Sequence, residues 1–403
     1  MLAGKKVALY VTGGIAVYKV CDLTRKLIKA GAEVKVAMTE SATQFVAPLT
    51  FQVLSKNDVY LDTFDEKISS EVAHIHLADW SDLAIIAPAT ANSIAKLANG
   101  IADDFVSTAL LATTAPIYIV PAMNQHMLEN PATVRNLKTI ALDGRRVIEP
   151  ATGFLAEGYE GRGRLPEPAD IITEIELDLT QRQADLPLKG RKMIVTAGGT
   201  KERIDPVRFI TNDSSGKMGY SLAIAARDLG AEVYLISASQ LLPNPVGITV
   251  IPVETSSEME TAILTEFDTT DIVIMAAAVS DYKPANEVKE KIKKSDAKMT
   301  IELLKTTDIL AELGQKKKQQ FLVGFAAETT NIATYAMGKL EKKKADMIVA
   351  NDVSQPHAGF NKDTNEVTIY SKLAEPIALS VRSKAEIAKG ILAVVLEQLN
   401  RKN

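Results

Sequence analysis

The sequence predicts an α/β protein made of two doubly wound domains, each with a mostly parallel sheet between layers of helices. Near-continuous apolar runs such as "DLAIIAPAT" and "DIVIMAAAV" end in small or polar residues, as strands buried on both faces do. Segments with apolar residues at helical spacing alternate with these runs. The alternation restarts near residue 191, where "RKMIVTAGG" repeats the pattern of "KKVALYVTGG".

Each half opens with a predicted βαβ unit. In the first half the strand "KKVALYVTGG" is followed by the helix "IAVYKVCDLTRKLIKAG" and the strand "AEVKVAM". In the second half "RKMIVTAGG" is followed by "YSLAIAARDLG" and "AEVYLIS", with the longer insertion "TNDSSGKMG" before the helix. Gly-Ala-Glu-Val recurs at both helix-to-strand turns, and we interpret it as common turn chemistry in independent domains rather than duplication.

Later strands continue the alternation: "APIYIVPAMN" in the first half, "FLVGFAAET" and "DMIVAND" in the second. After the helical segment "PADIITEIELDLTQRQ", the polar, proline-containing "ADLPLKG" suits a short linker near residues 184–190. We therefore expect one domain over residues 1–189 and another over residues 190–403.

The composition excludes several classes of protein. A chain of 403 residues with 46% hydrophobic and 24% charged residues is ordinary for a globular protein with more than one core. A net charge of −4 gives no basic field that would attract nucleic acid or membranes. The single cysteine, Cys21, excludes a disulfide framework and a cysteine-based zinc site, and fits a reducing cytoplasm.

The amino terminus superficially resembles a signal peptide, because two lysines precede an apolar run. Gly13 and Gly14 break that run, so we predict a buried first strand instead. No stretch approaches the roughly 18 apolar residues of a membrane span.

Ligands of such folds gather at the carboxyl ends of strands. In the first half these ends carry Thr12-Gly13-Gly14, Thr39-Glu40-Ser41, Thr90-Ala91 and "PAMN" ending at Asn124. Small hydroxyl, amide and glycine groups suit phosphate and heterocycle binding, and they equally suit plain helix capping. The G-x-G-x-x-G fingerprint of dinucleotide-binding folds is absent from both halves.

Two histidines occur in "VAHIHLADW". On an extended segment, His74 and His76 would face the same side, as a metal pair does. No third ligand converges on them in the sequence, so a general base beside a cofactor is the more plausible interpretation.

The stretch "EVAHIHLADWSDLAIIAPATANSIAKLANGIADDFVSTALLAT", followed by "PAMN", resembles the flavin-dependent cysteine decarboxylases. The resemblance implies a flavodoxin-like fold that binds FMN at a trimer interface, with His74 as the active-site base and Asn124 holding the substrate carboxylate. FMN would accept electrons from the thiol side of the substrate and return them after loss of CO2. The segments implied to contact FMN include Thr12, Gly13, Ser41, Thr90 and Ala91.

The stretch "GFLAEGYEGRG", residues 153–163, carries four glycines, a density typical of a mobile flap. It falls where the decarboxylases have a substrate clamp whose cysteine is credited with proton donation in the final reduction. This sequence has Glu157 there. A carboxyl desolvated by a closed flap could donate that proton; alternatively, Glu157 is a solvated loop residue and the acid lies elsewhere.

In the second half, "AGGTKERIDPVRFITNDSSGKMG", "AAAVSDYKP", "EKIKK", "VGFAAET" and "ANDVS" occur in an order that resembles phosphopantothenate–cysteine ligases. Joined, the halves resemble the bacterial bifunctional proteins of coenzyme A biosynthesis. The resemblance implies that CTP activates 4′-phosphopantothenate as an acyl-cytidylate with release of pyrophosphate. Cysteine then gives 4′-phosphopantothenoylcysteine, which the first half decarboxylates to 4′-phosphopantetheine.

By motif position, Lys291 would be needed to turn over the acyl intermediate and Asn212 would hold the pantothenate moiety. Residues 306–308 read Thr-Thr-Asp where the family pattern is Asn-Pro-Asp. The residues implied to line the nucleotide site are Asp281, Lys291, Phe325, Lys339 and Lys343, with Ala276, Ala277, Thr307, Asp308, Ile309 and Leu310 in backbone contact.

No two-carboxylate metal motif is evident, so we expect Mg2+ to be held largely through the phosphates and water. Trimeric decarboxylase contacts and dimeric ligase contacts would together give a homo-oligomer, a dodecamer. One alternative is a flavin-dependent decarboxylase that yields an enethiol, which fits the missing cysteine but not the ligase motifs. A second is a regulatory binding protein on the flavin fold, whose fungal relatives carry acidic tails unlike "LEQLNRKN" here.

Overall fold

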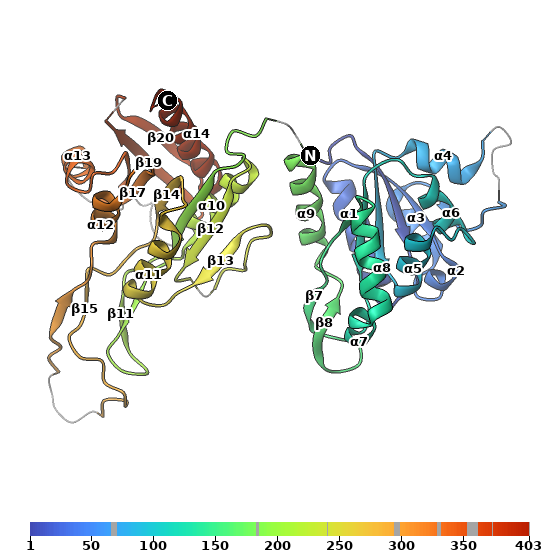
Figure 1. The fold of residues 1–403 in the computed structure, drawn as a ribbon, viewed down its shortest axis with the longest axis horizontal. Helices are drawn as coiled ribbons and strands as arrows, with labels where there is room; N and C mark the ends of the chain where they lie inside the picture. The colour runs from blue at the N-terminus through green and yellow to red at the C-terminus, as the bar shows by residue number, and fades with distance from the viewer. Residues whose placement is uncertain are drawn as a thin grey trace. The chain divides into compact units, whose positions relative to one another are not determined.

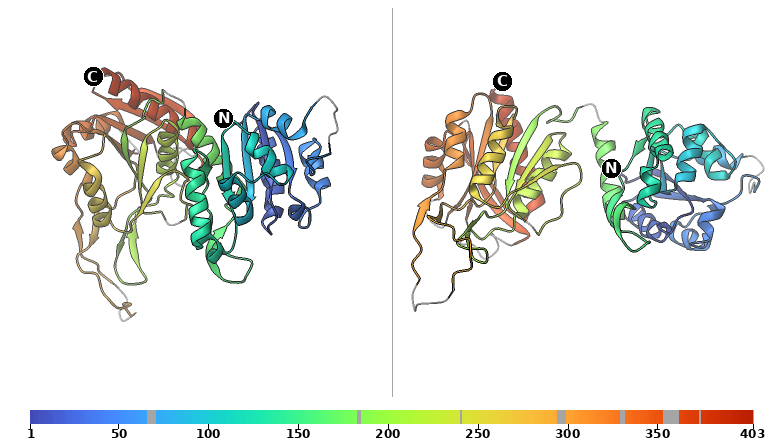
Figure 2. Two further views of the ribbon diagram at one scale, coloured as in Figure 1. Left: turned by 45° about the vertical axis from the view of Figure 1, so that its right-hand side comes forward. Right: turned by 60° about the horizontal axis from the view of Figure 1, so that its bottom comes forward.

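The computed structural model describes residues 1–65, 71–182, 185–239, 241–293, 299–328, 332–352, 362–372 and 374–402. The chain divides into two compact units, Met1–Thr180 and Gln181–Asn403, and each is an α/β domain with a mostly parallel sheet (Figures 1 and 2). The predicted two-domain α/β organisation is confirmed. Residue 184 of the predicted linker lies outside the described residues, and Leu188 is buried in the core of the second unit.

The sheet of the first unit has the strand order β3-β2-β1-β4-β5-β6, and every neighbouring pair is parallel. The first strand lies where the sequence predicted it, and all of it except Lys6 is buried. The strands are β1 (Lys6–Val11), β2 (Glu33–Met38), β3 (Val59–Tyr60), β4 (Leu83–Ala89), β5 (Ile117–Pro121) and β6 (Arg146–Val147).

Helices cover both faces of this sheet because β1 sends alternate side chains to opposite sides. Val7 and Leu9 pack with residues of α1, α3 and α9, whereas Ala8 and Tyr10 pack with residues of α4, α5, α6 and α8. The helices are α1 (Val17–Lys29), α2 (Glu40–Thr43), α3 (Pro48–Ser55), α4 (Ala73–Trp80), α5 (Ala91–Asn99), α6 (Phe105–Ala112), α7 (Gln125–Glu129), α8 (Pro131–Leu142) and α9 (Pro168–Gln181).

The sheet of the second unit has the order β13-β12-β9-β14-β17-β18-β19-β20. It is parallel as far as β18, but β19 and β20 are antiparallel. The parallel pattern predicted from the sequence therefore does not extend to this edge, where burial alternates along β19 instead of running continuously. The strands are β9 (Lys192–Ala197), β12 (Glu232–Ser237), β13 (Thr249–Pro252), β14 (Ile272–Met275), β17 (Phe321–Glu328), β18 (Met347–Asp352), β19 (Thr364–Ser371) and β20 (Ile377–Ser383).

The second sheet is also covered on both faces. Val195 and Ile274 pack with residues of α10 and α14, whereas Ile194 and Val273 pack with residues of α11 and α12. The helices are α10 (Lys217–Asp228), α11 (Ser256–Phe267), α12 (Ile309–Lys316), α13 (Ile332–Lys342) and α14 (Lys384–Lys402).

Both domains fix the loop after a central strand with a buried threonine at the carboxyl end of their first strand, Thr12 directly after β1 and Thr196 within β9. The Thr12 hydroxyl, fully buried, donates to the Pro88 carbonyl (2.6 Å) and accepts from the Thr90 amide (3.1 Å) just after β4. The equally buried Thr196 hydroxyl accepts from the Ala277 amide (3.0 Å) just after β14. The same residue type thus places the strand-end loop in each domain.

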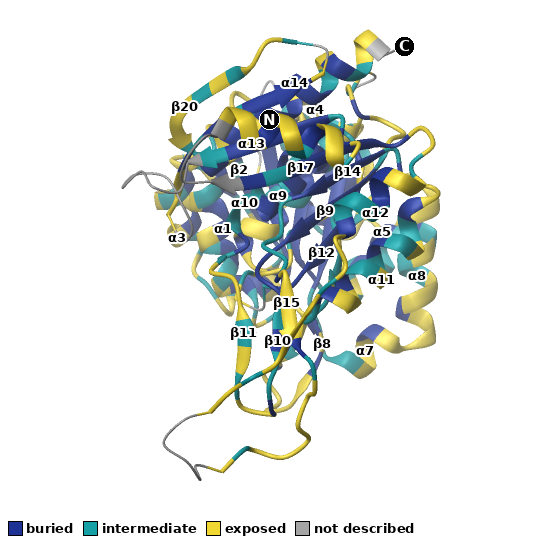
Figure 3. Cartoon of the chain, turned by 90° about the vertical axis from the view of Figure 1, so that its left-hand side faces the viewer, coloured by how far each residue is buried: buried dark blue, intermediate teal, exposed yellow. Residues whose placement is uncertain are grey.

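Small antiparallel pairs extend from both units. β7 (Ala151–Phe154) pairs with β8 (Glu160–Arg164), β10 (Lys201–Arg203) with β11 (Phe209–Thr211), and β15 (Tyr282–Pro284) with β16 (Leu303–Lys305). Figure 3 shows the sheets as mostly buried, whereas the segment that follows β15 is largely exposed. Across the described part of the chain, no helix combines the length and the apolarity that crossing a membrane requires.

Candidate functional site

The first domain has a cavity of about 800 Å3 at the carboxyl ends of its strands. Thr39, Thr90 and Asn124, each at the start of a helix, line it, so their neighbouring backbone N–H groups lie close by. The predicted site residues that line this cavity are Gly13, Ser41, Thr90, Ala91, Asn124 and Glu157.

Two glycines let the chain approach closely around this cavity. A Cβ at Gly13 would overlap Ser41, and a Cβ at Gly163 would overlap the Met123 carbonyl. Gly163 also has a φ of 138°, which other residues rarely adopt. The Met123 amide donates to the Gly163 carbonyl (3.0 Å), which joins the end of β8 to the "PAMN" segment.

The cations of the first cavity are paired with carboxylates. Lys96 contacts Asp103 (2.6 Å) and Asp104 (2.7 Å); burial alone would lower the pKa of its ammonium, but these bonds outweigh burial and raise that pKa. Lys19 lies 2.9 Å from Glu167, and Arg164 contacts the same carboxylate. The first cavity is therefore close to electrically balanced.

The flap predicted over residues 153–163 is the β7–β8 hairpin. Leu155 and Glu157, beside its turn, line the cavity, and the Glu157 side chain is exposed. The Asn124 amide donates to the Tyr159 hydroxyl (2.6 Å), so the hairpin is bonded directly to the "PAMN" segment. Tyr159 is not among the residues predicted from the sequence to form this site.

Two predicted residues of the first domain do not line its cavity. Thr12 is buried behind the Thr90 loop that it supports. His74 lies on α4 and is not among the described residues that line the cavity. Its Nδ1 is buried and has no hydrogen-bond partner among the described residues.

The expectation that the two histidines share one face of an extended segment is wrong. Residues 73–80 form the helix α4, and positions two apart on a helix point in different directions. His76 instead contacts Glu71 through Nδ1 (3.0 Å) and Lys35 through Nε2 (3.5 Å).

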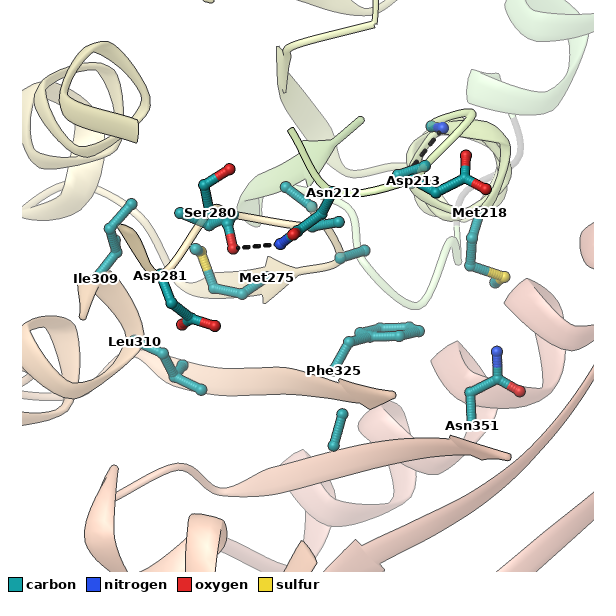
Figure 4. A pocket seen from close by; sticks show the side chains of 18 of the residues that line it. Asn212, Asp213, Met218, Met275, Ser280, Asp281, Ile309, Leu310, Phe325 and Asn351 are labelled. Atoms are coloured by element: carbon teal, nitrogen blue, oxygen red, sulfur yellow. Dashed lines mark hydrogen bonds between the residues drawn. The ribbon is translucent and has the colours of Figure 1, made fainter. Parts of the chain in front are cut away.

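The second domain has a cavity of about 830 Å3, again at strand ends (Figure 4). The Asn212 amide donates to the Val279 carbonyl (2.9 Å) and so connects the "TNDSSGKMG" loop to the segment after β14. The predicted residues that line this cavity are Asn212, Ala276, Ala277, Asp281, Thr307, Asp308, Ile309, Leu310, Phe325, Lys339 and Lys343.

Lys343 and its acidic neighbours form one side of the second cavity. Asp308 caps α12 by accepting from the Ala311 amide (3.1 Å) and also pairs with Lys343. Burial lowers the pKa of the Lys343 ammonium, and Asp281 opposes that shift. In Figure 4, Asp281 and Leu310 lie on one side of Phe325, whereas Asn351 lies on the other.

The other side of this cavity holds polar residues that the sequence reasoning missed. Lys217 of α10 pairs with Asp363 (2.6 Å). Lys384, the first residue of α14, lines the cavity and is only 7% exposed. Asn351 and Asn365 also line it, and the side-chain oxygen of each is buried without a partner among the described residues. Asn351, Asn365 and Lys384 lie more than 130 positions along the chain from Lys217, and no local motif connects them with it.

Lys291 does not line the cavity; it is exposed in the segment between β15 and β16. Its neighbour Ile292 is held in two places, because its amide donates to Asp205 (3.1 Å) and its carbonyl accepts from Arg208 (2.8 Å). The Asp205 carboxylate is fully buried. Hydrogen bonds from Arg208, and from the backbone amides of Val207, Arg208 and Ile292, hold its pKa well below the usual range.

No group of three or more histidine, cysteine or acidic side chains that could hold a metal ion occurs among the described residues. Phosphate oxygens and water could still supply the ligands of a Mg2+ ion that enters with a nucleotide.

The fold defines a two-domain α/β protein, and each domain has a cavity at the carboxyl ends of its parallel strands. A family model described as "Flavoprotein" matches residues 1–179, and one described as "DNA/pantothenate metabolism flavoprotein C-terminal domain" matches residues 188–399. The chain belongs to the family of bifunctional CoaBC proteins of coenzyme A biosynthesis, which ligate phosphopantothenate to cysteine and decarboxylate the product.

Three curated relatives illustrate the similarity. The "Coenzyme A biosynthesis bifunctional protein CoaBC" of Bacillus subtilis is 54% identical over 97% of both chains. The protein of the same name from Escherichia coli is 41% identical over 100% of this chain and 99% of its own. A "Cysteine/Cysteine sulfinic acid decarboxylase" from an unknown prokaryotic organism is 44% identical over 87% of this chain and 99% of its own.

Proposed function

We propose that residues 190–403 ligate 4′-phosphopantothenate to L-cysteine with CTP, and that residues 1–189 decarboxylate the product with FMN. The observation that supports this most strongly is that, of the predicted nucleotide and pantothenate residues, all except Lys291 line one cavity. Those residues come from five separate stretches of the chain.

In the ligation, an oxygen of the 4′-phosphopantothenate carboxylate attacks the α-phosphorus of CTP and pyrophosphate leaves. The neutral amine of cysteine then attacks the acyl carbon, CMP leaves with the carbon–oxygen bond pair, and the amine loses a proton. Lysines suit both steps because they neutralise charge on the departing phosphates. Lys339 and Lys343 line the cavity for this role, and we assign Lys291 to turnover of the acyl intermediate. Mg2+ would enter with the nucleotide.

The first cavity fits a phosphorylated flavin. Hydroxyls at Ser41, Thr90 and Ser93 line it, and the missing Cβ atoms at Gly13 and Gly163 leave room for the close approach of their segments. Bound FMN supplies a two-electron acceptor that returns its electrons after decarboxylation. The segments with Thr12, Gly13, Ser41, Thr90 and Ala91 would hold FMN, and Asn124 would hold the substrate carboxylate. Without its two-residue edge strand β3, the sheet order is 2-1-3-4-5 within the domain, which supports a flavodoxin-like fold.

We assign His74 as the base and Glu157 as the donor of the final proton. Since His74 lies outside the cavity of its own chain, we propose that a neighbouring copy supplies it in a homo-oligomer. Trimeric contacts of the first domain and dimeric contacts of the second would make that oligomer a dodecamer.

The test is to incubate the purified protein, with its flavin absorbance checked, with 4′-phosphopantothenate, cysteine, CTP and Mg2+. The expected products are 4′-phosphopantetheine, CO2, CMP and pyrophosphate. Absence of pyrophosphate with either CTP or ATP would overturn the ligase assignment.

The substitution of glutamate for the clamp cysteine favours a second candidate function for the first domain. In that case the decarboxylated product leaves as an enethiol instead of being reduced. The same incubation separates the two, because an enethiol is two hydrogen atoms lighter than the thiol.

A further inference from the structure

On the side of the second cavity opposite Asp281 lies a cation, Lys384, that has no role in the ligation as described above. Lys384 is only 7% exposed, and its backbone amide donates to the Asp363 carbonyl (3.0 Å). The Asp363 carboxylate contacts Lys217 (2.6 Å). Lys217 and Asp363 both act electrostatically on the Lys384 ammonium. Among the described residues, two cations and one carboxylate therefore meet here, and an anionic ligand would balance the excess positive charge.

Asn365 places an unsatisfied acceptor beside this cation. Its side chain is 4% exposed, its amide nitrogen faces the Met218 sulfur (4.0 Å), and its Oδ1 is buried without a partner in the described part of the chain. An orphaned amide oxygen is costly unless a ligand donates a hydrogen bond to it. This side of the cavity therefore suits a ligand that carries both an anion and an N–H group.

We propose that Lys384 binds the carboxylate of L-cysteine and that Asn365 accepts a hydrogen bond from its amino group. This inference rests on the proposed ligation. A polyphosphate would satisfy Lys384 but not Asn365. Ionised phosphate oxygens have no hydrogen to donate, and the Oδ1 of Asn365 can only accept a hydrogen bond. The two predicted nucleotide-site lysines that line the cavity, Lys339 and Lys343, belong to α13 and the residue that follows it.

The assignment also suits the chemistry of the attack. An amide oxygen that accepts one N–H orients a neutral amine and leaves its lone pair free to reach the acyl carbon. Burial first, and Lys217 second, lower the pKa of the Lys384 ammonium; a carboxylate bound there would offset both effects.

The test compares L-cysteine with cysteamine, which has the same amine and thiol but no carboxylate. In full-length Lys384→Met, kcat/KM for cysteine should fall about 10-fold or more, because a charge-assisted bond is lost, whereas kcat/KM for cysteamine should stay within about twofold. Asn365→Leu should lower kcat/KM for cysteine and for cysteamine by the same factor, because the amino group of each would contact Asn365. Lys389→Met, an exposed lysine on the same helix, is the matched control and should change neither.

Pyrophosphate release from CTP and 4′-phosphopantothenate without cysteine verifies that each variant is folded. An equal loss for cysteine and cysteamine in Lys384→Met, or a change confined to the KM of CTP, would overturn the inference and indicate a phosphate contact. If the unmodified protein releases no pyrophosphate, the proposed ligation fails, and this inference fails with it.

Discussion

The two cavities use the same structural frame and differ in charge. Each lies at the carboxyl ends of parallel strands, beside a loop held by a buried threonine, Thr12 or Thr196. Both cavities pair cations with carboxylates. Among the described lining residues, however, the first cavity has three cations and four carboxylates, whereas the second has five lysines and three aspartates. A bound electron carrier needs precise placement, whereas phosphoryl chemistry needs positive charge. The fold thus sets where a ligand binds, and the lining residues set which reaction follows.

The largest expected effect separates the two activities. His74→Asn should lower decarboxylation by about 10²–10⁴-fold, the range for loss of a general base, and should leave ligation unchanged. The measurement is accumulation of 4′-phosphopantothenoylcysteine by mass spectrometry. A parallel fall in ligation would contradict the assignment of one reaction to each domain.

Mixed oligomers of two inactive variants test whether His74 acts in the site of a neighbouring copy. Neither His74→Asn nor Asn124→Ala should decarboxylate alone, but co-assembled chains should recover part of the activity. No recovery in verified mixed oligomers would place His74 and Asn124 in the same site of one chain.

The next effect concerns the hairpin of the first domain. Glu157→Gln should lower formation of the reduced product by about 100-fold, because loss of a proton donor costs in this range, and an enethiol should accumulate. Glu157→Cys should restore reduction, since a thiol can donate the proton. Glu160→Gln, an exposed neighbour on β8, is the control; equal loss in both glutamine variants would point to a hairpin effect.

A smaller effect should appear in the second domain alone. Asp205→Asn weakens the contacts that hold Ile292, so ligation should fall about 10-fold, as expected when roughly 1.4 kcal/mol of positioning is lost. Flavin binding and decarboxylation of supplied 4′-phosphopantothenoylcysteine should not change. Unchanged ligation would show that the tether has no role in positioning Lys291.

The same residue predicts a pH dependence. The folded-state pKa of Asp205 is depressed below its ordinary value of 3.8, so its contacts stabilise the fold above that pH and are lost as the pH falls through the folded-state value. Asp205→Asn should therefore flatten the acid side of the stability curve of the second domain, measured by denaturant unfolding below pH 4. An unchanged acid slope would contradict this account.

The smallest effect tests what the domains share. Thr12→Val and Thr196→Val each leave a partly buried amide without its acceptor, which should cost about 1 kcal/mol of folding free energy. Each variant should destabilise only its own domain, as measured by separate unfolding signals for flavin release and for the ligase domain. A larger cost in one domain would show that the two threonines are not equivalent.

Much of the fold and of both cavities could be predicted from the sequence because buried parallel strands are continuous apolar runs and ligand residues follow them directly. Thr90, directly after β4, and Ala276, directly after β14, illustrate this rule. The antiparallel strands β19 and β20 were not predicted, since their alternating pattern differs from those runs. Helix α4 was missed because its apolar and polar residues also fit an extended segment. Lys384 and Asn365 join the cavity through tertiary packing alone, which no local pattern encodes.

The buried threonines have a consequence for engineering. Each hydroxyl bonds main-chain groups of the adjoining loop, and each makes one side-chain contact, Thr12 with the Thr90 hydroxyl (3.4 Å) and Thr196 with the Met275 sulfur (3.9 Å). Apart from these two partners, the side chains of that loop are free to vary while its path is kept. The segment after β4 or β14 could accordingly be exchanged for one of equal length from another protein of this architecture. The threonine hydroxyl would hold the backbone of the new loop as it holds the present one. The ligand specificity of the cavity could then be changed without altering the sheet or its helices.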